Sequence, residues 1–416
     1  NHSTSEVAVD KSKQFRGYLV VTAAYWAFTL TDGALRMLVL GHFHKLGYSA
    51  FTLALLFLLY EFFGVLTNLI GGWIGSRTGL RLTLLVGLSL QIAALGMLSG
   101  LSAAWNEALQ VAWVILAQGI SGIAKDFTKM SSKSAIKVLV PADADGTLFR
   151  WVALLTGSKN TLKGIGFFLG GFLLSAIGFR HALWGMAGGL AVVACLVAIL
   201  LPGAMGKTAS KFKLLDALRG SRAIKLLSTA RLFLFCARDV WFVVGLPVFL
   251  SEVFGWTFLS IGTYLALWVI GYGIVQAVAP RFMGRVGRQQ INDARAAQIW
   301  GGLLSLVPLG IYLLLHFQVP AQPAVLGGLA VFGVVFAINS AVHSYLVLAY
   351  SDSEKVSLNV GFYYMANAMG RLLGTLLSGL LYQFGGLGAC LLTASAMVAM
   401  ASLISLALPD TRDAVA

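Results

Sequence analysis

The chain has 416 residues, of which 58% are hydrophobic and only 11% are charged. Soluble domains contain about a quarter charged residues, so this composition excludes a soluble globular protein and indicates one embedded in a membrane. A formal net charge of +14 would favour a nucleic-acid partner in a soluble protein. Here we expect no nucleic acid, because the positions of the basic residues have another explanation.

Apolar stretches long enough to cross a bilayer recur along the whole chain. The predicted spans are 17–41, 50–74, 81–102, 108–130, 150–178 and 182–202, followed by 228–250, 257–280, 297–317, 324–349, 358–382 and 387–408. The expected fold class is therefore an all-α membrane protein in which twelve transmembrane helices form two pseudo-symmetric six-helix bundles.

The predicted organisation follows from these spans. It comprises a cytoplasmic N-terminal tail (1–16), a first bundle (17–202), a basic linker (203–225), a second bundle (226–408) and a cytoplasmic C-terminal tail (409–416). Nearly all loop cations fall on the side of the linker and the termini, whereas Lys45 and Arg180 fall on the other side. By the positive-inside rule, we expect both termini in the cytoplasm of a bacterium and the spans in its inner (plasma) membrane.

The two halves repeat each other at an offset close to half the chain length. Asp32 in the first span corresponds to Asp239 in the seventh, and each follows a phenylalanine by four residues. Lys163 in the fifth span corresponds to Arg371 in the eleventh. Transporters with duplicated halves place the solute site at the interface of the halves near the middle of the membrane.

Several charged residues lie inside the predicted spans, where a charge costs about 3 kcal/mol on insertion scales. We therefore expect them to face a watery cavity or one another. Lysines four residues apart share one face of the fourth span, and another such pair shares a face of the fifth. Because cations outnumber carboxylates, we expect an anionic solute with more than one charge, such as a phosphate ester. The candidate solute-binding residues are Arg36, Lys125, Lys129, Lys159, Lys163, Arg238 and Arg371.

Some of these charges also have a structural interpretation. Asp32 and Arg36 are four residues apart and can neutralise each other. Arg231 lies so near the linker that we expect it to extend to the cytoplasmic interface. Arg238 and Asp239 are adjacent and cannot share one helix face fully, so we expect at least one of them to find a partner elsewhere.

Four residues are candidates for proton coupling. Glu61 lies in the middle of a span with no cation within four residues, as is typical of a carboxyl group that exchanges protons. His343 is the only histidine well inside a span, and a structural hydrogen bond explains it equally well. The candidate proton-coupling residues are Asp32, Glu61, Asp239 and His343.

Nothing in the sequence indicates an enzyme. The cysteines Cys195, Cys236 and Cys390 lie in separate apolar stretches, so we expect no metal site and no cofactor. No Ser-His-Asp set and no phosphate-binding glycine loop stands near a membrane surface. A membrane receptor or channel is the alternative from a different class, although a receptor would usually carry a soluble sensing domain.

Two segments resemble the major facilitator superfamily. Gly72–Arg81, between spans two and three, resembles its signature loop, with Ser76 where the family has Asp. Gly166–Gly171, in span five, resembles its antiporter motif, with Phe167 where the family has Pro. The resemblance implies the twelve-helix fold of that superfamily and transport by alternating access. Without the carboxylate at Ser76, the charge contact that usually locks this loop is not expected.

Four longer segments resemble the organoarsenical exporters called ArsJ, and they cover residues 25–36, 122–133, 155–164 and 237–244. The resemblance implies export of 1-arseno-3-phosphoglycerate, which glyceraldehyde-3-phosphate dehydrogenase forms with arsenate in place of phosphate. It therefore implies a functional pairing with that enzyme and resistance to arsenate. We expect proton antiport and a monomer. An organophosphate antiporter and a general drug-proton exporter are the alternatives, but an excess of cations in the spans argues against a drug exporter.

Overall fold

The computed structural model describes residues 2–139, 145–202, 220–286, 293–351 and 356–409. Throughout these ranges the regular structure is helical, with no strand. Nine helices of the described chain are long and apolar enough to cross a membrane. The expected all-α membrane fold is therefore confirmed.

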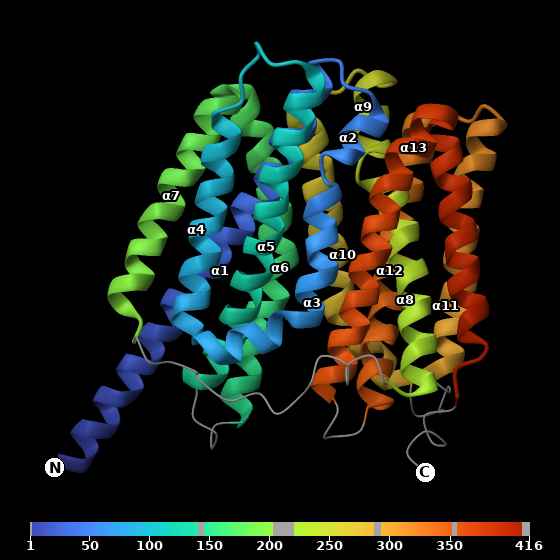
Figure 1. Ribbon diagram of the computed structural model, residues 1–416. Helices are drawn as coiled ribbons and strands as arrows, with labels where there is room; N and C mark the ends of the chain where they lie inside the picture. The colour runs from blue at the N-terminus through green and yellow to red at the C-terminus, as the bar shows by residue number, and fades with distance from the viewer. Residues whose placement is uncertain (1, 140–144, 203–219, 287–292, 352–355, 410–416) are drawn as a thin grey trace.

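The helices stand side by side in two groups (Figure 1). The first half contains α1 (His2–Lys45), α2 (Ala50–Leu55), α3 (Leu58–Thr78), α4 (Leu80–Ser99), α5 (Glu107–Leu139), α6 (Asp145–Ala176) and α7 (Gly178–Leu200). The second half contains α8 (Arg222–Phe242), α9 (Gly245–Glu252), α10 (Phe258–Val286), α11 (Asp293–His316), α12 (Ala321–Ala349) and α13 (Val356–Ser405). α1 begins and α13 ends at the same end of the molecule, which we call the terminal end (Figure 1).

The described helices supply the twelve predicted passes once their breaks are considered. Only 56–57 separate α2 from α3, and only 243–244 separate α8 from α9, so each pair forms one pass. α13 contains two passes, because Gly386 interrupts it with φ 63° and ψ −163°, a conformation that is essentially restricted to glycine. The nine membrane candidates count α13 once and omit α1 and α6, which pack against each other inside the first half.

The break between α8 and α9 is stabilised by a serine from α13. The backbone N–H groups of Val244 and Gly245 donate to Oγ of Ser378 at 3.1 and 2.9 Å. A backbone N–H group without a partner inside a membrane costs several kcal/mol, so irregular backbone there needs such an acceptor. Ser378 therefore allows the seventh pass to leave the helical conformation.

Small residues allow the two halves to pack closely at one end of the molecule. A Cβ atom on Gly171 of α6 would lie 2.6 Å from the carbonyl oxygen of Phe258, where α10 begins. A Cβ atom on Gly379 of α13 would lie 2.5 Å from the carbonyl oxygen of Ala50 in α2. Small residues allow helix backbones to come this close. Both contacts lie at the end opposite the terminal end, so we call it the closed end.

Several predicted regions differ from the structure or lie outside it. α1 begins at His2, so it includes most of the predicted N-terminal tail, and α8 begins at Arg222, inside the predicted linker. Residues 203–219 of that linker and 410–416 of the C-terminal tail lie outside the described residues. The signature-like loop is helical up to Thr78, but the side chains of 71–78 are not among those described.

Candidate functional site

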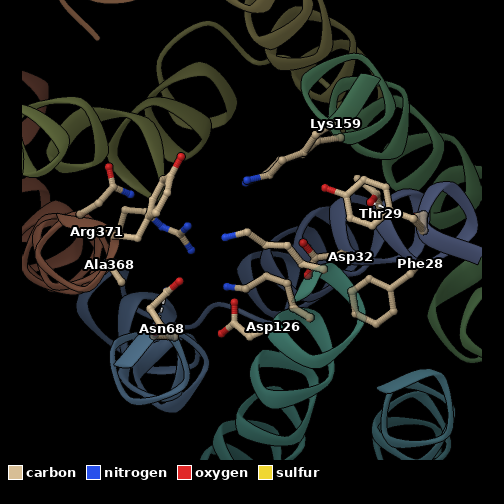
Figure 2. Close-up of a pocket in the computed structure, with 15 residues that line it drawn as sticks. Phe28, Thr29, Asp32, Asn68, Asp126, Lys159, Ala368 and Arg371 are labelled. Atoms are coloured by element: carbon tan, nitrogen blue, oxygen red, sulfur yellow. Dashed lines mark hydrogen bonds between the residues drawn. The ribbon is translucent and has the colours of Figure 1, made fainter. Parts of the chain in front are cut away.

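A cavity of about 80 Å³ lies between the two halves, with α1, α3, α5 and α6 on one side and α13 on the other. This volume holds several water molecules. Lys159 and Arg371 reach into it from opposite sides (Figure 2). The lining residues are Tyr25, Phe28, Thr29, Asp32, Gly64, Asn68, Lys125, Asp126, Lys129, Lys159, Lys163, Tyr364, Asn367, Ala368 and Arg371. The cavity thus lies where the internal repeat predicts a solute site.

The cavity wall carries more positive than negative charge. The cations that line it are Lys125, Lys129, Lys159, Lys163 and Arg371. Two carboxylates line it as well, those of Asp32 and Asp126. A low-dielectric cleft lined mainly by one sign of charge attracts ions of the opposite sign. The wall is therefore suited to an anion.

Glu61 forms a buried ion-pair triad beside the cavity. Its side chain is fully buried, and Oε1 lies 2.9 Å from Nη2 of Arg36. Its Oε2 lies 2.7 Å from Nη2 of Arg371, which belongs to the other half of the molecule. Both partners come from other helices, so they could not be identified from the residues that neighbour Glu61 in the sequence. The carboxylate is therefore a charged link between α1, α3 and α13.

Asp32 has a different partner from the one considered in the sequence. Its Oδ1 accepts a hydrogen bond from the hydroxyl group of Tyr60 at 2.6 Å. Arg36 instead pairs with Glu61, so Asp32 and Arg36 do not neutralise each other. Two neighbouring residues of α3 thus bind the two charged residues of α1 individually. Tyr60 binds Asp32, and Glu61 binds Arg36.

Aromatic rings lie beside the lysines of the cavity. The ammonium group of Lys125 lies 4.2 Å from the ring centroid of Tyr60, and that of Lys129 lies 5.3 Å from the ring centroid of Tyr364. Such cation–π contacts stabilise a lysine in a desolvated position. Because Tyr364 belongs to α13, the contact of Lys129 crosses from one half to the other.

Two polar amides in the wall were not among the predicted site residues. Asn68 of α3 and Asn367 of α13 both line the cavity. Asn68 donates to the carbonyl oxygen of Gly64 at 2.6 Å. Uncharged amides inside apolar spans are the signal that could have identified these residues, since a buried amide in a membrane needs polar partners.

Arg238 and Asp239 are paired with each other, so the expectation of a partner elsewhere is wrong. Both Nε and Nη2 of Arg238 lie 2.7 Å from Oδ1 of Asp239. The flexible arginine side chain folds back toward its neighbour and lies over Phe235, with the guanidinium carbon 4.7 Å from the ring centroid. Neither Arg238 nor Asp239 lines the cavity.

Arg231 is buried, so the expectation that it extends to the interface is also wrong. Its side chain is only 4% exposed. Nε donates to Oδ1 of Asn367 and Nη1 donates to Oγ of Ser340, both at 2.8 Å. Because α8 begins at Arg222, Arg231 lies more than two helical turns inside the bundle.

The structure brings together only some of the candidate residues. His343 is 1% exposed, its Nδ1 has no hydrogen-bond partner among the described residues, and it does not line the cavity. Arg36 and Glu61 lie behind the wall and are connected to it through Arg371. Among the described residues no group of histidine, cysteine or acidic side chains could hold a metal ion.

Two helical halves around a central charged cavity form the architecture of a secondary transporter. The sequence profile of the Major Facilitator Superfamily matches residues 18–341. The chain belongs to this superfamily, and it is a multi-pass membrane transporter and not an enzyme. No curated protein sequence matches it.

Solved transporter structures share the fold at low sequence identity. The nucleoside transporter NupG is 14% identical with a TM-score of 0.72, covering 95% of this chain and 99% of that one. A POT family transporter in complex with 5-aminolevulinic acid is 15% identical with a TM-score of 0.71, covering 94% and 95%. The xylose transporter XylE from E. coli, in a partially occluded inward-open conformation, is 15% identical with a TM-score of 0.67, covering 96% and 99%. These similarities establish the fold alone.

Proposed function

We propose that the chain exports 1-arseno-3-phosphoglycerate in exchange for protons and thereby confers resistance to arsenate. The observation that carries the anionic part of this proposal is the cavity wall, where five cations face two carboxylates. The arsenate part rests on the resemblance of four segments to the organoarsenical exporters. On this proposal the chain acts with glyceraldehyde-3-phosphate dehydrogenase, which would form the solute.

The acidic groups of the solute find suitable partners in this wall. Arg371 offers a planar guanidinium fork that matches a phosphate or arsenate group, whereas the lysines act as mobile point charges. Lys163 and Arg371 line the cavity from the two halves, at positions that correspond in the internal repeat. A solute bound to both would therefore contact both halves at once, as alternating access requires.

Glu61 supplies a physical link between solute and proton. An anionic solute that binds Arg371 competes with Glu61 for the same guanidinium group. A carboxylate that loses one of its two cations binds a proton more readily, because burial then disfavours its charge. Arg36, which binds the other oxygen of Glu61, would remain as its second partner during this exchange. Asp32, Asp239 and His343 remain the other candidate proton carriers.

The proposed direction of transport fits the arrangement of the halves. Close contacts between their backbones lie at the closed end, at Gly171 and Gly379. If the terminal end faces the cytoplasm of a bacterium, as the positive-inside rule predicts, this conformation blocks the exterior side. The solute would then load from the cytoplasm. We propose that one chain is sufficient for this cycle.

Uptake into everted membrane vesicles tests the proposal. Vesicles that contain the chain receive arsenate, glyceraldehyde-3-phosphate, the dehydrogenase and its nicotinamide cofactor. Accumulation of arsenic that requires every component, and that collapses with the proton gradient, is the expected result. Equal accumulation from arsenate alone, or transport of a cationic dye, would contradict it.

An organophosphate antiporter is the second candidate, because the same cations would serve a phosphate ester. In the same vesicles, uptake of 3-phosphoglycerate without arsenate would favour this alternative. A drug-proton exporter fits less well, since its cationic substrates would be repelled by the cavity wall. Membership of a transporter family also argues against a receptor or channel.

A further inference from the structure

The charged and polar groups of the cavity lie in two layers along the helix axes. α5 runs from the closed end towards the terminal end, whereas α6 and the first pass of α13 run the opposite way (Figure 1). On each helix one lining residue therefore lies nearer the closed end and another, four residues away, nearer the terminal end. The first set, which we call the Arg371 layer, is Lys125, Lys163 and Arg371. The second set, the Asn367 layer, is Lys129, Lys159 and Asn367.

Contacts between helices place the members of the Arg371 layer at one level. Lys125 lies against the ring of Tyr60, and Arg371 pairs with the next residue, Glu61. Tyr60 in turn bonds to Asp32 on α1. The backbone of Lys163 lies against Gly33, the residue after Asp32, where a Cβ atom would be 2.7 Å from the lysine carbonyl oxygen.

Other contacts place the Asn367 layer nearer the terminal end. Lys129 lies over the ring of Tyr364, which precedes Asn367 on the same helix. Ser158, the residue before Lys159, accepts a hydrogen bond from Trp26 at 2.8 Å. On α1, Trp26 lies one to two turns nearer the terminal end than Asp32. On all three helices, the layers are separated by four residues, or about 6 Å at a rise of 1.5 Å per residue.

A buried arginine supports the Asn367 layer from behind. Arg231 donates through Nε to Oδ1 of Asn367 at 2.8 Å. An arginine can only donate, so the amide oxygen must face it, and the amide nitrogen of Asn367 is left to donate to a solute. In the described part of the chain, no carboxylate lies within ion-pair distance of Arg231. Arg231 therefore also adds a positive charge behind this layer, with no carboxylate partner among the described residues.

We propose that the two layers are two anion subsites. Together they select a solute by the distance between its two acidic groups. The Arg371 layer would bind one acidic group, and the Asn367 layer, oriented by Arg231, would bind a second. The preferred solute class is a short chain of about three carbons with a phosphate-like group at each end, because such a chain spans about one helical turn. This inference rests on the proposed function, since it assumes an anionic solute in this cavity.

Three simple anions test whether binding depends on the distance between two acidic groups. The purified full-length chain in lipid nanodiscs is titrated by calorimetry with propane-1,3-diyl bisphosphate, inorganic pyrophosphate and propyl phosphate. The first carries two separated phosphate groups, the second carries two adjacent ones, and the third carries one. We expect propane-1,3-diyl bisphosphate to bind at least about tenfold more tightly than either other anion, as one additional charge-assisted hydrogen bond would give.

The outcomes separate this inference from the proposed function. If pyrophosphate binds as tightly as propane-1,3-diyl bisphosphate, the affinity depends on total charge alone. The two subsites are then refuted, while the proposal of an anionic solute is retained. If all three anions bind equally, the subsites are refuted in the same way. If none binds, both the subsites and the proposed anionic solute are refuted.

Variants in each layer complete the test. Lys159→Gln and Lys163→Gln should each reduce the preference for propane-1,3-diyl bisphosphate over pyrophosphate about tenfold. Lys225→Gln is the matched control, because this lysine is exposed on α8 and does not line the cavity. A preference that survives Lys159→Gln unchanged would refute the Asn367 layer.

The orienting role of Arg231 has its own measurement. Arg231→Gln should reduce the same preference, because the amide of Asn367 is then free to turn its oxygen to the cavity. Asn367→Asp should reduce it further, since a carboxylate in this layer repels the second acidic group. Binding of propyl phosphate shows that each variant is folded. If both variants keep the wild-type preference, Arg231 has a structural role only and the orienting role is refuted.

Discussion

Removal of the charge of Glu61 tests the link between the two halves most directly. Glu61→Gln keeps the shape of the side chain but replaces one carboxylate oxygen with an NH2 group. The amide oxygen can still accept from one arginine, whereas the amide nitrogen faces the other guanidinium as a second donor. Because Arg36 and Arg371 bind different oxygens at 2.9 and 2.7 Å, the variant cannot satisfy both.

The magnitude follows from the burial of the triad. Glu61 is fully buried, and the side chains of Arg36 and Arg371 are only 11% and 17% exposed. Removal of one partner from a buried ion pair costs about 3–5 kcal/mol, because a buried charge is left uncompensated. A loss of this size changes an equilibrium constant by about a hundredfold or more. Because the Arg371–Glu61 pair joins the halves, much of that loss should weaken the conformation seen here.

Thermal unfolding of the purified protein in nanodiscs measures the effect. Glu61→Gln should lower the melting temperature clearly, and the double variant Glu61→Gln/Arg371→Gln should recover part of the loss through a coupling energy of about 0.5–3 kcal/mol. Glu252→Gln is the control, since this glutamate is exposed and accepts a hydrogen bond from Tyr382 at 3.2 Å. The reasoning is refuted if Glu61→Gln is no more destabilising than the control, or if the two losses simply add.

The same variant examines proton coupling. In proteoliposomes, Glu61→Gln should reduce the dependence of transport on a pH gradient. The variant lacks the carboxylate that would bind a proton when the solute takes Arg371. Dependence that remains unchanged would move the coupling to Asp32 or Asp239.

Two further predictions concern the solute site and the closed end. Lys163→Ala and Arg371→Ala should each abolish transport in vesicles while the protein still inserts at wild-type levels by immunoblot; normal transport by both would make these cations structural. Gly379→Val should slow transport and lower the melting temperature, because its first added carbon would lie 2.5 Å from the carbonyl oxygen of Ala50. Gly327→Val, where an added Cβ would meet no described atom within 4 Å beyond its chain neighbours and its own helix backbone, should change neither, and equal effects would show that the close approach is unimportant.

The helices and the charges of the cavity were predictable because each depends on local sequence. A membrane span needs about 20 apolar residues, and a charge within it must face water or another charge. These two constraints selected seven candidate cations. Of these, Arg36 and Arg238 do not line the cavity, whereas the other five do: Lys125, Lys129, Lys159, Lys163 and Arg371. The offset of the internal repeat also indicated that the site would lie between the halves.

The pairing of the charges was not predictable, because partners come from helices distant in the sequence. Glu61 and Arg371 are 310 residues apart, yet their side chains are in contact. Spacing rules apply only within one helix, so they allowed a pair between Asp32 and Arg36 that the structure does not contain. Tyr60 is the residue that changes the outcome, since its hydroxyl group binds Asp32.

The two halves contribute charges of different kinds, and this difference bears on how the solute would act. The first half supplies lysines, whose flexible stems allow the ammonium groups to follow an anion with little change in their surroundings. In the second half, Arg231 and Arg238 are held by fixed partners, Asn367 and Asp239. Arg371 alone among these three arginines both lines the cavity and pairs with the opposite half. Exchange of its partner Glu61 for a solute would therefore be the step at which binding alters the contact between the halves.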